Sequence, residues 1–473
     1  MPALSSSTLP LLPQADAALR GVSYARQRAS VGVVHLGLGA FHRAHQAMVF
    51  DALLAAGDPR WGICGVAMHS TELATALAAQ DGLYSVQVAS HAGRRWQVVG
   101  AMLQSCVAAR EPSRVRDAMA APATRWITLT VTEKGYGPAL GDLLAQGLAA
   151  RHQAGEDGLT IASCDNLMGN GRQLLTLCLE AATRLDASGA LAAWISRHCT
   201  FPSSMVDRIV PAATPERRAQ ALSALGLDDT CALGTEGFWE WVIERRFADP
   251  SDAALLEGAG VRVVDDVAPF ELAKLRMLNG SHTAIACMGA VAGLPTVAET
   301  VGRPEVARFV RGLMTVEVMP HVTRPGSADY RDALLARFVN PDLRHSVHQI
   351  ATDSSQKIPQ RWVPSALAQL EQGGAIEHLA FAAAAWMRYQ TGVSDDGQAY
   401  RLADPLADVT QALALQHHGD AAATVDALLG VAAIWGAALP AHAQWRSRVM
   451  HWLARIQAQG MLPAVGDFVD LRP

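Results

Sequence analysis

The sequence predicts an α/β protein in which a doubly wound, mostly parallel sheet is followed by a mainly α-helical domain. Short apolar runs alternate with helical patterns up to about residue 260, as expected for parallel strands joined by helices. Beyond residue 268, alanine and leucine dominate and strand-like runs become scarce. The 473 residues also exceed what a single hydrophobic core usually organises. We therefore expect two domains, residues 1–268 and residues 269–473.

Composition and charge exclude several classes of protein. Half of the residues are hydrophobic and 18% are charged, which is typical of a globular chain. The net charge of −5 comes with no basic stripe, so we expect no nucleic-acid partner and no membrane partner. The seven scattered cysteines indicate neither a disulfide framework nor a structural zinc site. Because we find no signal peptide and no membrane-spanning run, we expect a soluble cytoplasmic enzyme, either a monomer or a small homo-oligomer.

The first strand, helix and second strand follow a mixed stretch, residues 1–30, that we expect to lie on the surface as an arm. Residues 31–36 are a short apolar run, which is typical of a buried parallel strand. A glycine-containing loop comes next, and a helical pattern then continues to a stop near Pro59. Residues 61–67 are predicted as the next strand, so this stretch forms a β-α-β unit of the expected size.

The loop Gly37-Leu-Gly39 stands where dinucleotide-binding folds hold a phosphate group. In those folds the first glycine allows a tight turn, and the second lets the backbone approach a pyrophosphate at the positive end of a helix. The usual third glycine is absent because His42 takes its place, so an ordinary strand-to-helix turn is the alternative. Where an acid would bind the ribose, about 20 residues further on, Glu72 is the nearest one and no Arg is present to hold a 2′-phosphate. The sequence therefore favours NAD over NADP, and the cofactor-binding candidates are Gly37, Leu38, Gly39, Ala40, Phe41 and Glu72.

Later segments add strands to the first domain and helices to the second. Residues 83–89 and 96–99 are predicted as a hairpin. Two further buried strands are predicted, and each leads into polar residues. Residues 126–132 lead into Glu133, and residues 159–163 lead into the loop that contains Asn166. Residues 261–264 are the last strand-like run, and residues 376–389 are predicted as a helix buried in the second domain.

The segment from Glu271 to Thr283 is predicted as a buried helix that carries three polar side chains, Lys274, Asn279 and His282. At roughly 100° per residue, an α-helix would place these three within an arc of about 140°. A lysine can act as a base near neutral pH when burial lowers its pKa, and an amide can donate to a developing alkoxide. The alternative is a helix with a snorkelling lysine and a hydrogen-bonded core histidine.

Four motifs occur in an order that resembles a known family. They are Gly37–Gln46, Cys164-Asp-Asn166, Phe201–Pro211 and Lys274-x4-Asn-Gly-x-His282. Over nearly the whole chain they are similar to the mannitol dehydrogenase family, the polyol-specific long-chain dehydrogenases. The resemblance implies a Rossmann-type domain that binds a nicotinamide cofactor, a mainly helical substrate domain, and zinc-independent hydride transfer with no metal site.

The spacing and the resemblance together suggest catalytic roles for residues of both domains. Lys274 would be the general acid/base that exchanges a proton with the substrate oxygen. Asn166 and Asn279 would donate hydrogen bonds to that oxygen as negative charge develops, one from each domain. His282 would orient the substrate and the lysine.

Two acids are candidate functional residues, and each also has a purely structural interpretation. The resemblance suggests that Glu133 gates a proton path to Lys274, but it could instead cap a helix or form an ion pair. Asp207 would lie near the cofactor, but it could instead be a turn aspartate paired with Arg208. His42 and His45 resemble catalytic residues at first sight, yet packing of the loop is the favoured interpretation for both.

Within the family, the chain most resembles the fructuronate reductase branch, whose members interconvert D-fructuronate and D-mannonate. The motifs behind this are Thr132–Tyr136, Met205–Thr214, Leu275–His282 and Gln356–Arg361. A sugar acid carries a carboxylate that a polyol lacks, so additional cations suit it. The substrate-binding candidates are Lys134, Lys357 and Arg361.

Departures from the family pattern keep the substrate open. Glu236-Gly-Phe238 replaces the usual Glu-Pro-Phe, and Asp353-Ser-Ser355 replaces Asp-Gly-Ser. The segment between Tyr136 and Leu159 is also much shorter than in most members. A mannitol or arabinitol type polyol dehydrogenase is therefore the alternative enzyme. A nucleotide-binding protein that kept the fold and lost the chemistry is the alternative from another class.

Overall fold

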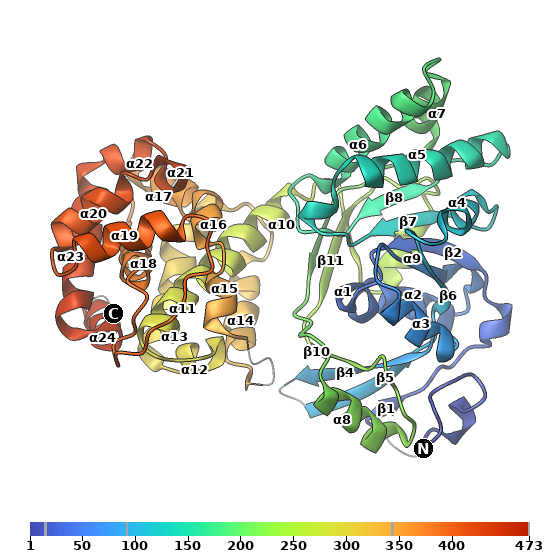
Figure 1. The fold of residues 1–473 in the computed structure, drawn as a ribbon, viewed down its shortest axis with the longest axis horizontal. Helices are drawn as coiled ribbons and strands as arrows, with labels where there is room; N and C mark the ends of the chain where they lie inside the picture. Colours follow the sequence, from blue (N-terminus) through green and yellow to red (C-terminus); the bar gives the residue numbers. More distant parts are fainter. Residues whose placement is uncertain (14–16, 91–92, 342–344, 472–473) are drawn as a thin grey trace. The chain divides into compact units, whose positions relative to one another are not determined.

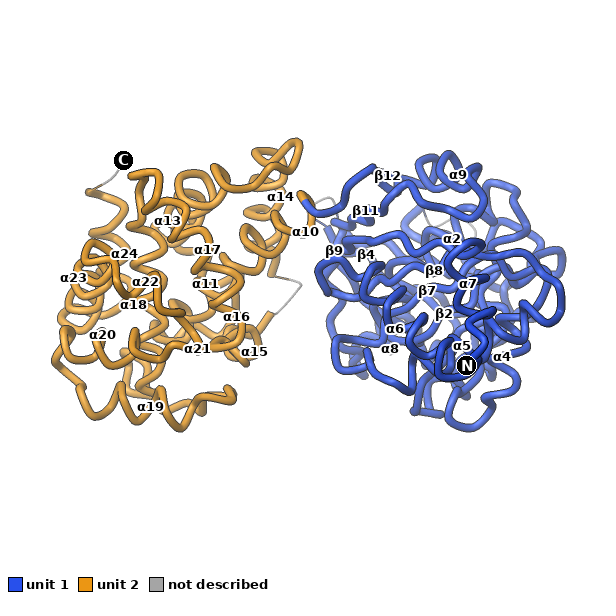
Figure 2. The backbone as a smooth tube through the Cα atoms, turned by 90° about the horizontal axis from the view of Figure 1, so that it is seen from above, with its two compact units in different colours: residues 1–268 blue, residues 269–473 orange. Residues whose placement is uncertain are grey.

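The computed structural model describes residues 1–13, 17–90, 93–341 and 345–471. The chain forms two compact units, residues 1–268 and residues 269–473, which Figure 2 draws in separate colours. In the part of the chain that the structure describes, every helix is too short or too polar to span a bilayer.

A five-stranded parallel sheet organises the first unit (Figure 1). Its strand order is β6-β3-β2-β7-β8, and every neighbouring pair is parallel. The strands are β2 (Val31–Leu36), β3 (Gly62–Ala67), β6 (Met102–Val107), β7 (Trp126–Leu129) and β8 (Thr160–Ser163). The doubly wound topology predicted from the sequence is therefore confirmed. In such sheets a ligand binds beyond the carboxyl ends of the strands where the order reverses, which are β2 and β7 here.

Alternate residues of these strands pack into two separate cores. Val33 and Ile63 belong to the core that contains the apolar side of helix α2 (Gln46–Ala55). Val34 and Cys64 belong to the core formed with helices such as α5 (Pro138–Gln153). Because helices cover both faces, the strands must be apolar throughout, which explains their continuous apolar runs in the sequence.

The other helices of the first unit connect or flank these strands. They are α1 (Ala40–Ala44), α3 (Glu72–Ala79), α4 (Pro112–Ala120), α6 (Asn170–Leu185), α7 (Ala190–His198), α8 (Pro215–Leu225) and α9 (Asp252–Gly258). Figure 1 shows α5, α6 and α7 together beside β7 and β8, and all three helices contribute residues to the same core.

Two smaller sheets complete the unit, and each combines parallel strand pairs with one antiparallel pair. One has the order β1-β5-β4-β10 and the other β12-β11-β9. Their strands are β1 (Leu19–Arg20), β4 (Tyr84–Ser90), β5 (Gly93–Val99), β9 (Ser204–Asp207), β10 (Leu233–Glu236), β11 (Glu240–Glu244) and β12 (Arg262–Val264). β4 and β5 are antiparallel, which confirms the hairpin, although its turn residues 91 and 92 lie outside the described residues. β9 and β11 are also antiparallel.

The N-terminal arm is anchored rather than merely laid on the surface. Leu4 is fully buried and Leu12 nearly so, in a small core that includes Val98. The Leu4 N–H also donates to the Asp228 carbonyl. Two leucines in a stretch without periodicity gave no sign of this burial in the sequence.

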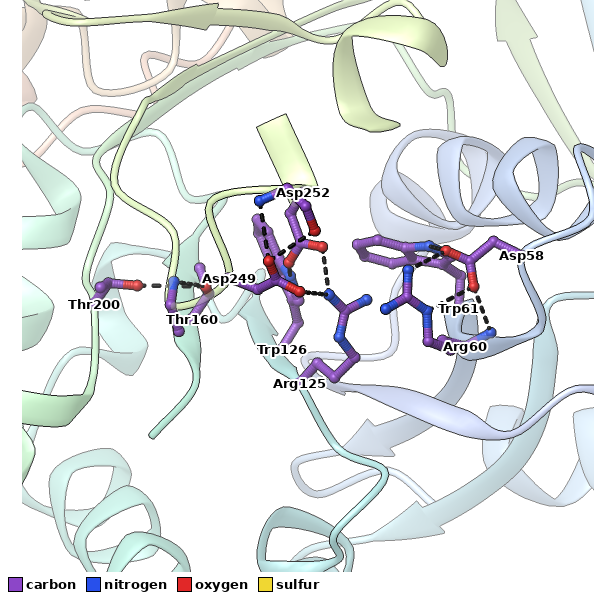
Figure 3. A network of polar contacts seen from close by, with 11 residues as sticks. Asp58, Arg60, Trp61, Arg125, Trp126, Thr160, Thr200, Asp249 and Asp252 are labelled. Carbon is purple, nitrogen blue, oxygen red and sulfur yellow. Dashed lines mark hydrogen bonds and ion pairs between the residues drawn. The ribbon is translucent and has the colours of Figure 1, made fainter. Parts of the chain in front are cut away.

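A network of ion pairs holds the amino end of the five-stranded sheet (Figure 3). Arg125, just before β7, donates through Nη2 to Asp249 at 2.9 Å and to Asp252 at 2.5 Å. The indole N–H of Trp126, the first residue of β7, donates to the other oxygen of Asp252 at 2.8 Å. Burial raises the pKa of Asp252, and its hydrogen bonds and the charge of Arg125 oppose that rise. The start of β7 is thus fixed by a buried carboxylate that serves two partners.

The second unit is helical and is built around α18 (Glu377–Tyr389), which confirms the predicted buried helix. All of its residues except Glu377 and Arg388 are buried. Five of the buried residues are alanines, and α18 packs against α11 (Gly280–Val291) and α23 (Ala443–Gln459).

Further helices surround this centre. They are α10 (Ala268–Ala273), α12 (Val297–Val301), α13 (Pro304–Gly312), α14 (Ser327–Phe338), α15 (Val347–Ala351), α16 (Ser354–Arg361), α17 (Val363–Glu371), α19 (Ala407–Gln416), α20 (Ala421–Leu429), α21 (Ala432–Trp435), α22 (Ala438–Ala441) and α24 (Met461–Asp470). Among the described residues, two segments are π-helices, η5 (Lys274–Asn279) and η6 (Leu313–Val318).

Candidate active site

The glycine loop follows β2 and turns directly into α1. Gly37 has φ +98°, and a Cβ placed on it would lie 2.1 Å from the Thr130 carbonyl oxygen. Only glycine fits that turn. At Gly39 a Cβ would meet nothing closer than the Gly37 carbonyl oxygen at 3.7 Å, so packing alone does not demand a glycine there. A bare backbone at an uncrowded helix start is the feature that a phosphate group requires.

The first half of the loop is already engaged by the fold. The N–H groups of Gly37 and Leu38 both donate to the Val66 carbonyl, at 2.9 and 3.1 Å. The Leu38 side chain is 6% exposed and belongs to the core. Any contact of Leu38 with a cofactor would therefore run through its carbonyl group. Gly39, Ala40 and Phe41 are partly exposed and better placed.

Two stacked imidazoles support the loop from beneath. The rings of His35 and His42 lie 3.3 Å apart, nearly parallel, and both are fully buried. His35 bridges Thr128 Oγ1 at 2.8 Å and Thr130 Oγ1 at 2.9 Å. Burial lowers the pKa of His35 to about 3 and that of His42 well below its usual value. Both rings are neutral at pH 7 and serve packing, as the sequence interpretation favoured for His42.

The neighbouring residues of α1 are buried as well. Arg43 donates to the Cys231 carbonyl at 2.7 Å and lies over the Tyr84 ring. His45 Nε2 lies 3.0 Å from the Glu240 carbonyl oxygen, and its ring stacks on Phe41. These contacts order the loop.

The two acids of the predicted cofactor site occupy different settings. Glu72 is exposed and begins α3, five residues after β3 ends. Its negative charge therefore also stabilises the amino end of that helix, where the helix dipole is positive. Asp207 is 4% exposed and ends β9, opposite Glu240 of β11. Its neighbour Arg208 donates to the carbonyl oxygens of Ala44 at 2.5 Å and Glu236 at 3.0 Å.

The carboxyl ends of β7 and β8 place Glu133, Lys134 and Asn166 at one edge of the sheet. Glu133 and Lys134 lie in a short 3-10 helix, η4 (Glu133–Gly135), after β7. Asn166 lies in the loop between β8 and α6, and all three residues are exposed. Since β2 and the glycine loop end at the same edge, Glu133, Lys134, Asn166 and the glycine loop all lie at the edge where a parallel sheet binds ligands.

In the second unit, Lys274 and Asn279 lie at the two ends of the π-helix η5. The hydrogen bonds here run from residue i+5 to residue i, as from the Gly280 N–H to the Leu275 carbonyl. An α-helix would turn Asn279 about 140° away from Lys274, whereas the wider turn of a π-helix reduces this angle. The two side chains thus share one face more closely than α-helical spacing predicts. Single π-turns inside α-helices often mark functional sites.

Residues around η5 hold its carboxyl end. Arg361 donates to the Asn279 carbonyl at 3.0 Å and to Thr283 Oγ1 at 2.8 Å. His282 is 8% exposed, and its ring packs on Phe338 with centroids 4.7 Å apart and edge-on to His345 at 5.5 Å. The predicted substrate cation Arg361 therefore also fixes the backbone that carries Asn279.

Lys357 lies one helical turn before Arg361 on α16. Its Nζ donates to the carbonyl oxygens of Ile350, at 3.1 Å, and Thr352. Burial and the nearby charge of Arg361 lower the pKa of Lys357. An ammonium group has three donors, so these two carbonyls leave one for a substrate hydroxyl.

Two residues of this edge escaped the sequence interpretation, Asp165 and Thr132. The Asp165 carboxylate accepts the N–H groups of Val131 and Thr132, at 3.2 and 2.7 Å. Thr132 has φ +65°, which nothing in the sequence indicates because β-branched residues avoid that region. Asp165 stood inside the motif Cys164-Asp-Asn166, but only the tertiary contact reveals what it does.

Both halves of the chain match known families. Residues 31–253 match the model of the mannitol dehydrogenase Rossmann domain, and residues 266–457 match that of the mannitol dehydrogenase C-terminal domain. The D-mannonate oxidoreductase of Escherichia coli (strain K12) is 38% identical over 455 residues, covering 89% of this chain and 92% of that protein. The mannitol 2-dehydrogenase of Phaeosphaeria nodorum is 36% identical over 428 residues, covering 83% of this chain and 75% of that protein.

A solved structure extends the likeness to three dimensions. The Pseudomonas fluorescens mannitol 2-dehydrogenase, in ternary complex with NAD and D-mannitol, superposes with a TM-score of 0.82 at 30% identity. The match covers the whole of both chains.

Proposed function

The chain belongs to the mannitol dehydrogenase family, and we propose that it is an NAD-dependent oxidoreductase that interconverts D-fructuronate and D-mannonate. The family makes it an oxidoreductase that acts on a CH–OH group. The observation that carries the narrower proposal is the 38% identity to a D-mannonate oxidoreductase over 89% of the chain.

Residues of the first unit fit a dinucleotide. The turn at Gly37 is closed to any side chain, while the backbone at Gly39 is uncrowded at a helix start. We assign the pyrophosphate to Gly39, Ala40 and Phe41, with the loop tied to β3 through Gly37 and Leu38. Glu72 and Asp207 are the candidate acids for the ribose groups. When bound, the nicotinamide supplies the hydride in reduction and accepts it in oxidation.

The proton is handled by Lys274. In reduction its ammonium group donates a proton to the carbonyl oxygen, and in oxidation the neutral amine removes it from the hydroxyl. Asn279, at the other end of the same π-helix, donates its amide to the same oxygen as negative charge develops. Asn166 adds a second amide from the first unit, and His282 orients the substrate. Glu133 is the first unit's candidate acid for a proton path.

The substrate carboxylate is assigned to cations. Lys134 is exposed beside Glu133, whereas Arg361 is bound to the backbone of η5. We therefore assign the carboxylate first to Lys134, with Arg361 as the group that keeps Asn279 in place. Lys357 donates its remaining proton to a substrate hydroxyl.

The second candidate is a polyol dehydrogenase of the mannitol or arabinitol type. It is favoured by the TM-score of 0.82 to a mannitol 2-dehydrogenase. A substrate panel separates the two: fructuronate, fructose, mannonate, mannitol and arabinitol, each with NAD(H) and NADP(H), followed at the absorbance of the reduced cofactor. We expect turnover of fructuronate and mannonate with NAD(H), and turnover of fructose and mannitol alone would contradict the proposal.

Replacing Lys274 by alanine tests the proton assignment. The chain contains three lysines, Lys134, Lys274 and Lys357, so each can be removed in turn. We expect Lys274→Ala to lower kcat by about 10³-fold with cofactor affinity unchanged, because general acid–base groups contribute roughly 10²–10⁴-fold. Lys134→Ala should instead raise the KM for the sugar acid, since it removes a charge that binds substrate before and during the reaction. A folded Lys274→Ala enzyme with near-normal kcat would exclude Lys274 as the acid/base.

A further inference from the structure

Thr132 holds a backbone conformation that ordinary residues avoid. It lies between β7 and η4, directly before Glu133, with φ +65° and ψ 164°. This region is essentially confined to glycine, and occupying it costs of order 1–3 kcal/mol. Thr132 is β-branched, which makes the conformation less favourable still. Other groups must therefore impose it.

The Asp165 carboxylate binds the backbone at this point. Its Oδ1 accepts the Thr132 N–H at 2.7 Å, and its Oδ2 accepts the Val131 N–H at 3.2 Å. Asp165 is 7% exposed, and burial raises its pKa while these two N–H groups and the Tyr136 hydroxyl oppose the rise. Tyr136 in turn hydrogen-bonds Ser163 at the end of β8. The chain after β7 is thus clamped to the chain after β8.

The main chain of Asp165 is also held by hydrogen bonds. Its carbonyl accepts the Leu167 N–H at 2.9 Å and the Asn170 side-chain amide at 3.0 Å. Asn170 also pairs with the backbone of Ser204 in both directions, at 2.8 and 2.9 Å. Asn166, the next residue along the chain, therefore starts from a backbone that cannot shift without breaking several buried hydrogen bonds.

We propose that Asp165 is a positioning residue that sets Glu133 and Asn166 in register with each other. Its side chain fixes the strained residue before Glu133, and its main chain fixes the residue before Asn166. The proposed proton path and the proposed amide donor would then be held as one unit. The inference rests on the proposed function, because both residues take their roles from it.

Asp165→Asn tests the inference in the full-length enzyme. An amide keeps one acceptor oxygen but turns an NH₂ group toward the other backbone N–H, so one of the two N–H groups loses its acceptor and the strained conformation of Thr132 is held less firmly. We expect kcat to fall by about 10–100-fold, because a displacement of catalytic groups by about 1 Å lowers turnover by this order. The dissociation constant for NADH should stay within about threefold of the wild-type value. Asp252→Asn is the matched control: the same change in a buried aspartate that holds the other end of β7. It should lower the melting temperature and leave kcat per folded molecule within about twofold.

A double variant distinguishes positioning from general support of the fold. Glycine occupies the conformation of residue 132 without strain, so Thr132→Gly should remove the force that Asp165 opposes. We expect the fold-decrease in kcat that Asp165→Asn causes in the Thr132→Gly background to be less than about a third of the fold-decrease it causes in the wild-type background. Equal losses in both backgrounds, or an Asp165→Asn enzyme with normal kcat, would overturn the inference. A wild-type enzyme without turnover on the whole substrate panel would instead overturn the proposed function.

Discussion

The two ends of strand β7 are both held by a buried aspartate, yet they are held in opposite ways. At the amino end, the Asp252 carboxylate pairs with the side chains of Arg125 and Trp126 (Figure 3). At the carboxyl end, Asp165 binds backbone N–H groups and forces Thr132 into a glycine-like conformation. One end joins oppositely charged side chains, and the other holds a backbone under strain.

This difference corresponds to the division of labour within parallel sheets. Ligands bind beyond the carboxyl ends of the strands, so precise placement is needed there and stability can be supplied elsewhere. Among the described residues three non-glycine residues have positive φ, Asp81, Thr132 and Asp353, and only Thr132 is β-branched. Strain that would otherwise be removed is expected to persist where function requires it. We therefore expect changes at the amino end to alter stability and changes at the carboxyl end to alter turnover.

Removing Arg125 should have the largest effect on stability. Arg125→Ala leaves Asp252 buried beside Trp126 without its cation, and breaking a buried pair in this way costs about 3–5 kcal/mol. Urea denaturation followed by circular dichroism measures the loss. Turnover per folded molecule should stay near wild type, and a selective loss of kcat would break the division between the two ends.

Arg60→Ala provides the comparison for Arg125→Ala. Arg60 pairs with Asp58 in the same region, but its side chain is 46% exposed. An exposed pair contributes about 0–1 kcal/mol, so this variant should be nearly as stable as wild type. A loss as large as that of Arg125→Ala would mean that burial does not govern the amino-end network.

The sequence predicted features that depend on neighbours along the chain. The turn at Gly37 follows from a strand, a glycine and a helix start, and the hairpin of β4 and β5 follows from two alternating runs around a turn. Lys274 and Asn279 were predicted to lie on one helical segment, but their spacing was interpreted as α-helical, because no residue in η5 distinguishes a π-turn from an α-turn. The strain at Thr132 was beyond prediction, since it is imposed by Asp165, 33 positions later.

Acid should weaken the carboxyl end through His35. Burial lowers the pKa of this histidine to about 3, against about 6.5 in an unfolded chain, so the unfolded state binds the proton more readily. The contribution of neutral, buried His35 to the free energy of unfolding is therefore fully present above pH 6.5 and is lost as the pH falls toward 3. At pH 5 the loss is about 2 kcal/mol. His35→Gln should be less stable than wild type at pH 7 yet lose less stability between pH 7 and pH 5. Urea denaturation at the two pH values measures this loss in the free energy of unfolding. If His35→Gln loses as much as wild type, another group causes the acid sensitivity. Some loss should remain in the variant because His42 is also buried.

The change at Thr132 itself sharpens the comparison most directly. Thr132→Gly removes a side chain that is exposed and a conformation that costs of order 1–3 kcal/mol, so the folded state gains. Glycine also adds entropy to the unfolded chain, which offsets about 0.5–1 kcal/mol of that gain. We expect a net stabilisation of about 1 kcal/mol by urea denaturation, together with a modest fall in kcat as the loop before Glu133 loosens. The same change at Thr128, which lies within β7 and hydrogen-bonds His35, should destabilise the protein. A destabilised Thr132→Gly variant would show that residue 132 is relaxed, and the contrast between the two ends of β7 would then lie only in the type of hydrogen-bond partner.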